Sequence, residues 1–179
     1  KLGFTVHLKH EIRAKANKEH QSVGIAPFAA FTSKMYPIEK MKIVATKLAE
    51  NGYKVYLFGG GKKEVEELKT WENFHSNITS LAGTISFEEE LHAIAKLETM
   101  ISMDSANMHL ASLMGTRTIS IWGGTHPYAG FLGYGQAMED VIQDETMKCR
   151  PTSIFGKDPK EFENYDYFQN LSAEYVYQQ

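Results

Sequence analysis

The 179-residue chain has little cysteine, little excess charge and no long hydrophobic run, and each shortage excludes a class of protein. Its single cysteine, Cys149, cannot form an internal disulfide, which is typical of a reducing compartment. No apolar run approaches the roughly 20 residues that span a bilayer. The 19 Lys and Arg against 22 Asp and Glu give a formal net charge of -3, which argues against a general nucleic-acid-binding protein.

Motifs for metal binding and for hydrolase catalysis are also missing. The sequence has no H-x-x-x-H, no cysteine pair and no D-x-D, so it predicts no metal site. Without a G-x-S-x-G elbow, an α/β-hydrolase triad is not expected. What remains is a globular composition, with 42% hydrophobic residues, that can bury a sizeable core.

Apolar runs alternate with amphipathic stretches from residue 22 onward. Strands are expected over 22–28, 53–58, 78–82, 99–103 and 116–122, with helices between them. Pro37 is typical of a helix start, Asn51-Gly52 of a helix end, and Ser86 with Glu89 of a capping box. Strands and helices in alternation predict an α/β fold, a Rossmann-like parallel sheet with helices on both faces.

Such sheets bind ligands at the carboxyl ends of their strands. The loops at that edge are 28–37, 59–64, 83–86, 104–109 and 123–133. Asp104 or Ser105 is expected to cap the helix that follows, whose free amides and dipole form an anion site suited to a phosphate. Ala106 allows a ligand close to the backbone, and His109 could donate to a phosphate oxygen. An ordinary capped helix with a core-facing histidine is the equally weighted alternative.

Three other loops carry weaker signals. The glycines at 59–61 let a ligand approach the backbone, although they form neither G-x-G-x-x-G nor a phosphate loop, and a tight turn explains them as well. Lys34 can reach a diphosphate as a flexible point charge, or it can simply be solvated. His126, in a glycine-rich loop, could touch a ligand or merely be exposed.

Four blocks of the chain, over about residues 22 to 135, together resemble the family 9 glycosyltransferases, the lipopolysaccharide heptosyltransferases and their relatives. The run from Asp104 to Gly115 resembles the family pattern D-[ST]-G-x-x-H-L-A-x-x-x-G. The loop Gly123-Gly-Thr-His-Pro127 fits G-x-T-x-P, Lys34-Met-Tyr-Pro37 fits K-x-[WY]-P, and Gly59-Gly60 fits a strand that ends in a double glycine.

This resemblance implies the C-terminal, donor-binding half of a GT-B fold, which has two Rossmann-like domains facing a cleft. The first residue is Lys1 rather than Met, so we expect a piece of a longer protein. The expected organisation is a linker arm from a missing N-terminal domain over 1–21, a nucleotide-sugar-binding domain over 22–145, and an acidic, aromatic-rich tail over 146–179 that packs on it.

Position by position, the resemblance implies a site for a nucleotide-sugar donor. Lys34 and His109 would stabilise the leaving diphosphate, Glu64 would bind the ribose hydroxyls and Ile85 would line the base pocket. The full set of implied donor-binding residues is Ala29, Ala30, Lys34, Gly60, Gly61, Glu64, Ile85, Asp104, Ser105, Ala106, Asn107, His109 and Thr125.

The chain departs from the family pattern at three of these positions. Ala106 replaces the usual glycine, and Ala29 and Ala30 lack the hydroxyls often found near the phosphates. These departures put the identity of the donor in doubt.

The implied activity is inverting transfer from a nucleoside-diphosphate sugar to a lipid-linked or glycan acceptor, in lipopolysaccharide or cell-surface glycan synthesis. ADP-heptose is the family's best-known donor, and no metal or other cofactor is implied. The family's general base is an acid in the N-terminal domain, so this chain is expected to be inactive alone. The implied location is the cytoplasm of a Gram-negative bacterium, either free or peripheral at the inner membrane. A GT-B sugar-nucleotide epimerase and a non-catalytic nucleotide-binding domain remain as alternatives.

Overall fold

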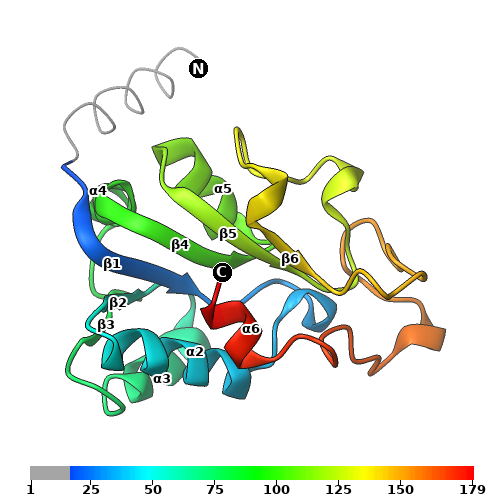
Figure 1. Cartoon of the computed structure of the whole chain (residues 1–179), viewed down its shortest axis with the longest axis horizontal. Coiled ribbons are helices and arrows are strands. Elements are labelled where there is room, and N and C mark those ends of the chain that lie inside the picture. Colours follow the sequence, from blue (N-terminus) through cyan, green and yellow to red (C-terminus); the bar gives the residue numbers. More distant parts are fainter. Residues whose placement is uncertain (1–16) are drawn as a thin grey trace.

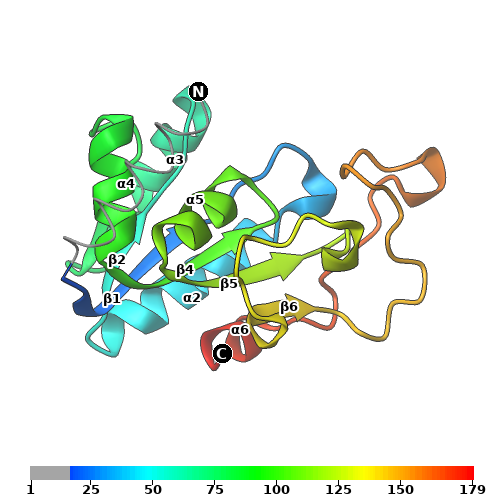
Figure 2. The same ribbon diagram turned by 90° about the horizontal axis from the view of Figure 1, so that it is seen from above.

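The computed structural model describes residues 17–179 and places a parallel six-stranded sheet between two layers of helices (Figures 1 and 2). The strands are β1 Glu19–Ala26, β2 Lys54–Leu57, β3 Ile78–Ser80, β4 Leu97–Met103, β5 Arg117–Trp122 and β6 Val141–Gln143. The helices are α2 Ile38–Glu50, α3 Lys62–Trp71, α4 Phe87–Lys96, α5 Ala106–Met114 and α6 Ala173–Tyr177. Short 3-10 turns are η1 Thr32–Lys34, η2 Pro127–Ala129, η3 Met138–Asp140 and η4 Lys160–Phe162.

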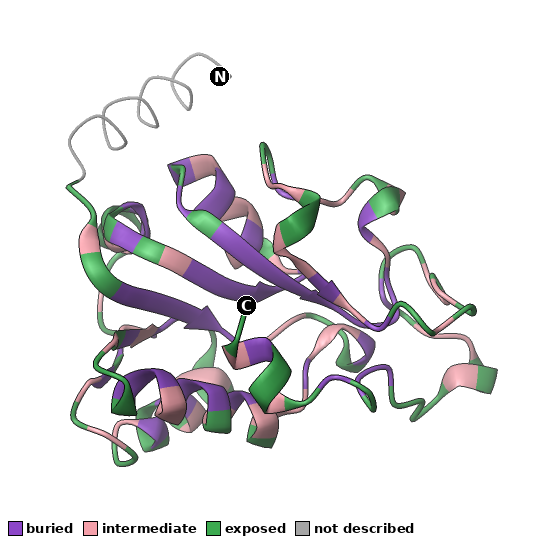
Figure 3. Cartoon of the chain, in the orientation of Figure 1, coloured by how far each residue is buried: buried purple, intermediate pink, exposed green. Residues whose placement is uncertain are grey.

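The strand order is β3-β2-β1-β4-β5-β6, and every neighbouring pair is parallel. Helices α2, α3 and α6 cover one face of the sheet and α4 and α5 cover the other (Figure 1). This confirms the predicted Rossmann-like α/β fold. The strands are apolar and buried along most of their length because helices cover both faces (Figure 3).

Local signals set the helix boundaries. The hydroxyl of Ser86 accepts the Glu89 amide of α4, and the Glu89 carboxylate accepts the Ser86 amide at 2.8 Å, which completes the predicted capping box. Gly115 ends α5 in the left-handed region at φ 76°, which a glycine adopts without strain. Pro37 occupies the N-cap position of α2, so the expected start of that helix is confirmed.

Two parts of the sheet differ from the sequence-based expectation. Strand β1 begins at Glu19, inside the expected linker arm, and Glu19 pairs with Leu97 across a bulge. The sequence does not indicate that the strand begins at residue 19, because residues 19–21 are polar and show no apolar pattern. Strand β6 was not predicted, since three residues are too few to show a period of two. Residues 1–16 of the expected arm lie outside the described part of the chain.

The tail from residue 146 returns to the α2 face of the domain (Figure 2). Tyr167, Phe168, Leu171 and Val176 are buried in the same core as α2 and α3. The Tyr36 hydroxyl donates to the Leu171 carbonyl at 2.9 Å, and burial raises the pKa of Tyr36 to about 12. These residues of the tail therefore pack against the α2 face, whereas the aromatic residue Tyr165 is exposed.

Candidate functional site

The candidate site lies at the carboxyl ends of the neighbouring strands β1 and β4, where the strand order reverses. From β1 the chain adds β2 and β3 on one side of the sheet, and from β4 it adds β5 and β6 on the other side. The loops that follow β1 and β4 leave toward opposite faces, because α2 and α5 lie on opposite faces. A crevice at such a switch point is the usual ligand site of a doubly wound sheet.

A cavity of about 570 Å³ occupies this crevice. Most of the residues implied by the sequence line it, namely Ala29, Ala30, Lys34, Gly60, Glu64, Asp104, Ser105, Ala106, Asn107 and His109. The structure thus brings together segments of β1, β2 and β4 that are far apart in the sequence. A volume of this size suits a nucleotide-sized ligand.

Lys34 is held in this cavity by Asp104. The Lys34 ammonium lies 2.8 Å from Asp104 Oδ2, and the two side chains are only 14% and 5% exposed. Asp104 Oδ2 also accepts the Thr125 hydroxyl at 2.8 Å. An ammonium has three donors, so pairing with Asp104 leaves two N–H groups of Lys34 for another acceptor. Lys34 is therefore a positioned cation and not a solvated one.

The amino end of α5 forms the wall beside Lys34. Ser105 occupies the N-cap position, but its side chain makes no capping hydrogen bond and lies 3.2 Å from the Ser102 hydroxyl. The expected cap by Asp104 or Ser105 is thus wrong, because Asp104 is engaged by Lys34 and Thr125. Ala106 and Asn107 of the first turn line the cavity. Uncapped amides and the helix dipole leave partial positive charge at this wall.

The opposite wall contains the glycine loop after β2. The Gly60 amide donates to Glu64 Oε2 at 2.8 Å, so the Glu64 carboxylate holds the loop from the first turn of α3. A Cβ at Gly59 would lie 2.9 Å from Leu68 Cδ1, whereas a Cβ at Gly60 would meet nothing within 4 Å. A Cβ at Gly59 would therefore displace the end of the Leu68 side chain, whereas Gly60 faces open space in the cavity.

Three residues implied by the sequence do not line the cavity. Gly61 is the N-cap of α3 at φ 81°, where it serves the turn. Ile85 lies half-buried in the loop before α4. Thr125 is fully buried and reaches the site only through its hydrogen bond to Asp104.

The cavity also contains Phe28, Glu90, Leu110 and Phe131, which the sequence analysis missed, and Gly59, which it singled out within the glycine loop without assigning it to the donor. Glu90 is the one ionisable member of this group, and burial raises its pKa. A signal for it existed, because Glu90 lies one turn after the capping Ser86, at the end of α4 that faces the ligand edge. Leu110 and Phe131 add apolar surface near His109.

Residues of the tail contact the 123–125 loop and Lys34. The Arg150 guanidinium donates to the carbonyls of Gly123 and Thr125, and the Thr152 amide donates to the Gly124 carbonyl at 2.9 Å. Gly156, at φ 98°, lies so close to Lys34 that a Cβ there would be 2.5 Å from Lys34 Cδ. Residues after 146 thus fix both the 123–125 loop and the lysine.

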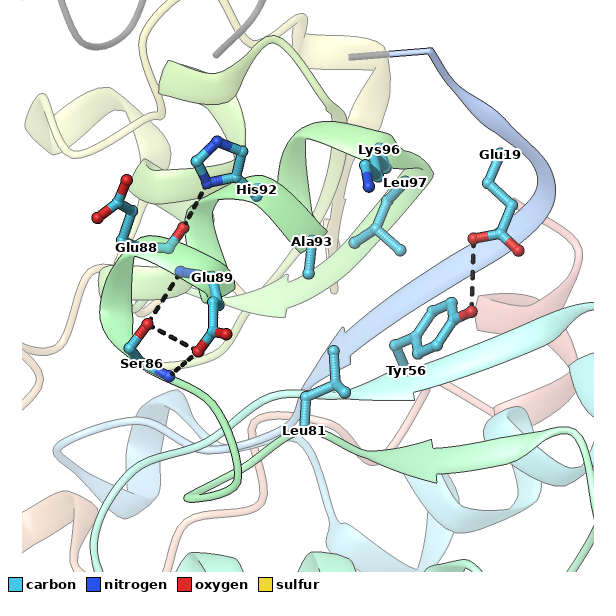
Figure 4. Close-up of a pocket in the computed structure, with 10 residues that line it drawn as sticks. All are labelled: Glu19, Tyr56, Leu81, Ser86, Glu88, Glu89, His92, Ala93, Lys96 and Leu97. Atoms are coloured by element: carbon cyan, nitrogen blue, oxygen red, sulfur yellow. Dashed lines mark hydrogen bonds between the residues drawn. The ribbon is translucent and has the colours of Figure 1, made fainter. Parts of the chain in front are cut away.

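A larger cavity of about 810 Å³ lies along α4 (Figure 4). Its residues include Glu19 at the start of β1, Leu97 at the start of β4, and the α4 residues Glu88 and His92. Figure 4 shows the Glu89 carboxylate turned back onto Ser86, so that acid is already engaged in capping. This cavity extends along α4 to the starts of β1 and β4 and contains neither Lys34 nor any residue of α5, so it is separate from the crevice at the switch point.

Among residues 17–179, no group of three or more His, Cys, Asp and Glu side chains could hold a metal ion. In the same part of the chain, no helix is long and apolar enough to cross a membrane.

Comparisons with known proteins point to one family. Lipooligosaccharide heptosyltransferase 2 of Haemophilus influenzae is 30% identical over 138 residues, which cover 74% of this chain and 40% of that protein. Lipopolysaccharide heptosyltransferase 2 of Escherichia coli K12 is 26% identical over 116 residues, covering 62% of this chain and 33% of that protein. The chain therefore spans less than half the length of these relatives.

Solved structures share the fold. E. coli ADP-heptose lps heptosyltransferase II matches with a TM-score of 0.67 at 19% identity, covering 96% of this chain and 49% of that structure. E. coli heptosyltransferase WaaC with ADP-2-deoxy-2-fluoro heptose matches with a TM-score of 0.70 at 19% identity, covering 95% and 46%. The model of glycosyltransferase family 9 (heptosyltransferase) matches residues 1–155. With most of its length matched by that model, the chain belongs to glycosyltransferase family 9.

Proposed function

We propose that this chain is the nucleotide-sugar donor-binding domain of an inverting, metal-independent glycosyltransferase in lipopolysaccharide or cell-surface glycan synthesis. The observation that carries the proposal is the juxtaposition of Lys34 with the uncapped amino end of α5 in one cavity at the switch point. A diphosphate seated there would receive hydrogen bonds from the ammonium and from backbone amides.

The proposed chemistry is displacement at the anomeric carbon of the donor. An acceptor hydroxyl oxygen attacks that carbon, the bond from the carbon to the diphosphate oxygen breaks, and the nucleoside diphosphate leaves with an extra negative charge. Lys34 and the amino end of α5 line the cavity in which, under this proposal, that charge forms. His109, in the first turns of α5, would donate a further hydrogen bond to the diphosphate. Such preorganised stabilisation is commonly the largest contribution to catalysis of this kind.

The small residues of the cavity fit a donor that approaches the backbone. Ala29 and Ala30 follow β1 and Ala106 begins α5, and all three line the cavity without polar side-chain atoms. Recognition of the phosphates would therefore depend on Lys34, His109 and main-chain amides. We propose that Glu64 accepts hydrogen bonds from the ribose hydroxyls with the carboxylate oxygen that Gly60 does not use.

The acceptor and the general base would come from outside this chain. Lys34, Glu64 and His109 serve the donor in this proposal, and the chain spans 40% or less of the curated relatives described above. We propose that an N-terminal domain of the same protein supplies the acceptor site, and that this chain alone binds nucleotide without turnover. The relatives' names suggest a heptose as the transferred sugar.

Calorimetric titration of the chain with ADP, GDP, CDP, UDP and inorganic pyrophosphate, without added metal, tests this proposal. Lys34→Ala and His109→Ala are each expected to weaken diphosphate binding about 10-fold or more, because a hydrogen bond to a charged group contributes about 1.5–3 kcal/mol. Lys96→Ala is the matched control, since Lys96 lies at the far edge of the sheet and carries the same charge. Undiminished affinity in both site variants, with folding intact, would refute the site.

A further inference from the structure

Glu90 is an acid in the candidate donor cavity that nothing described so far uses. It lies on α4, one turn after the capping Ser86, and lines the cavity together with Asn107, His109 and Leu110 of α5. Within the described chain, its carboxylate takes part in no hydrogen bond or ion pair. Other acids near it are engaged, since Asp104 is paired with Lys34 and Glu64 accepts the Gly60 amide.

The lining of the cavity carries charges of both signs. Its one lysine, Lys34, is paired with Asp104, and the amino end of α5 adds partial positive charge. The further carboxylates, Glu64 and Glu90, come from α3 and α4. A ligand that has both an anionic group and groups rich in N–H or O–H donors matches such a lining. A nucleoside diphosphate has both, with the phosphates as the anionic group and the donors on the ribose and base.

An unpaired carboxylate selects for hydrogen-bond donors. A carboxylate only accepts hydrogen bonds, and leaving it without a partner in a ligand-filled, desolvated cavity is costly. Burial already raises the pKa of Glu90 before any ligand enters, which is consistent with a site short of solvent. In the proposed function Glu64 accepts hydrogen bonds from the ribose hydroxyls. The Glu90 carboxylate is therefore the one left to accept a hydrogen bond from the base.

The bases differ in what they can offer a carboxylate. Guanine presents a ring N–H beside an amino group, and adenine and cytosine each present one amino group. Uracil presents one N–H between two carbonyl oxygens, which repel a carboxylate. A site that holds a base by a polar pair discriminates far more strongly against the wrong base than an apolar pocket does.

We infer that Glu90 is a specificity-determining residue, which selects a donor whose base carries an amino group over a uracil nucleotide. This inference rests on the proposed donor-binding function and adds the class of base. It concerns the acid on α4 and leaves the diphosphate-binding role of Lys34 and His109 unchanged.

The test compares GDP, ADP, CDP and UDP, with inorganic pyrophosphate as a ligand without a base, on the unmodified chain and on Glu90→Ala. Alanine keeps the helix intact, and Glu90 is only half-buried, so the variant is expected to fold. At least one amino-bearing diphosphate should bind the unmodified chain 10-fold or more tightly than UDP. Glu90→Ala should reduce that ratio about 10-fold, because a good polar pair to a base edge contributes about 1–3 kcal/mol of discrimination. Pyrophosphate should bind the variant at least as well as the unmodified chain.

The matched control is Glu88→Ala. Glu88 lies two residues earlier on the same helix, is exposed and lines the other cavity, so it carries the same charge without facing the proposed donor. The ratio of affinities should be unchanged in this variant.

The outcomes separate the two proposals. If pyrophosphate and the diphosphates bind but UDP binds as tightly as the others, or if Glu90→Ala leaves the ratio unchanged, the inference about Glu90 fails and the donor site stands. If neither pyrophosphate nor any nucleotide binds at millimolar concentration, both fail.

Discussion

Thr125→Val tests the physical basis of the lysine's position. Thr125 is fully buried, and its hydroxyl donates to Asp104 Oδ2, the same oxygen that pairs with Lys34. Valine has nearly the same shape but no donor, so the substitution leaves that oxygen with Lys34 alone. A hydrogen bond to a charged group contributes about 1.5–3 kcal/mol. Because the Asp104 side chain is 5% exposed, water cannot readily replace the lost donor, and we expect a loss of about 2 kcal/mol.

The assay is thermal unfolding followed by circular dichroism or calorimetry at neutral pH. In a chain of this length a loss of 1 kcal/mol lowers Tm by about 2–4 °C, so Thr125→Val should lower it by about 4–8 °C. Thr125→Ser is the control, since it keeps the donor and removes one methyl group, at about 1 kcal/mol. The reasoning is refuted if the valine variant unfolds within 1 °C of the unmodified chain, or if serine is the more damaging of the two.

Three further predictions concern packing, pH and the loop after β5. Gly123→Ala should destabilise strongly, because its Cβ would lie 2.0 Å from a backbone oxygen, whereas Gly60→Ala, with nothing within 4 Å, should leave Tm nearly unchanged; parallel thermal melts check both. The Glu67 carboxylate accepts a hydrogen bond from the Trp71 indole N–H, and this bond is the largest cause that lowers the pKa of Glu67 in the folded chain. The stability that the ionised Glu67 carboxylate contributes is therefore present above its unfolded pKa and is lost as pH falls through its folded pKa. Glu67→Gln should consequently lose less stability than the unmodified chain between pH 7 and pH 3, as urea midpoints would show. Arg150→Lys should raise amide exchange over 123–125, since a lysine cannot reproduce a fork of donors to two carbonyls; equal exchange in both proteins contradicts this.

The sheet and its main helices were predictable because each has a local cause in the sequence. The strands from 22 to 122 are short apolar runs, as strands covered on both faces must be. The capping box at Ser86 and the glycine stop at Gly115 fix two helix ends through contacts within a few residues. Such causes can be found by inspection of a single sequence.

The remaining structure depends on contacts between distant segments. Strand β6 and helix α6 have three and five residues, which are too few for a periodic pattern. They form because Ile142 and Val176 pack into the core of the domain. The resemblance implied that Lys34 and Asp104 belong to one site. Their ion pair joins residues 70 positions apart in the sequence (104 − 34), so it could be seen only in the folded structure. Glu90 was missed because a third consecutive glutamate in a polar turn resembles an ordinary solvated helix start.

The contact between Gly156 and Lys34 has a consequence for the order of folding. The Ser33 hydroxyl donates a hydrogen bond to the Gly156 carbonyl, 123 positions later in the sequence. The turn that carries Lys34 therefore gains its last contacts from a segment near the end of the chain. On a ribosome the sheet from β1 to β5 can assemble before that segment has emerged, because domains form as their residues become available. The lysine would then reach its final position in one of the last steps of maturation. A nascent chain halted before residue 156 should hold a formed sheet whose diphosphate site is still incomplete.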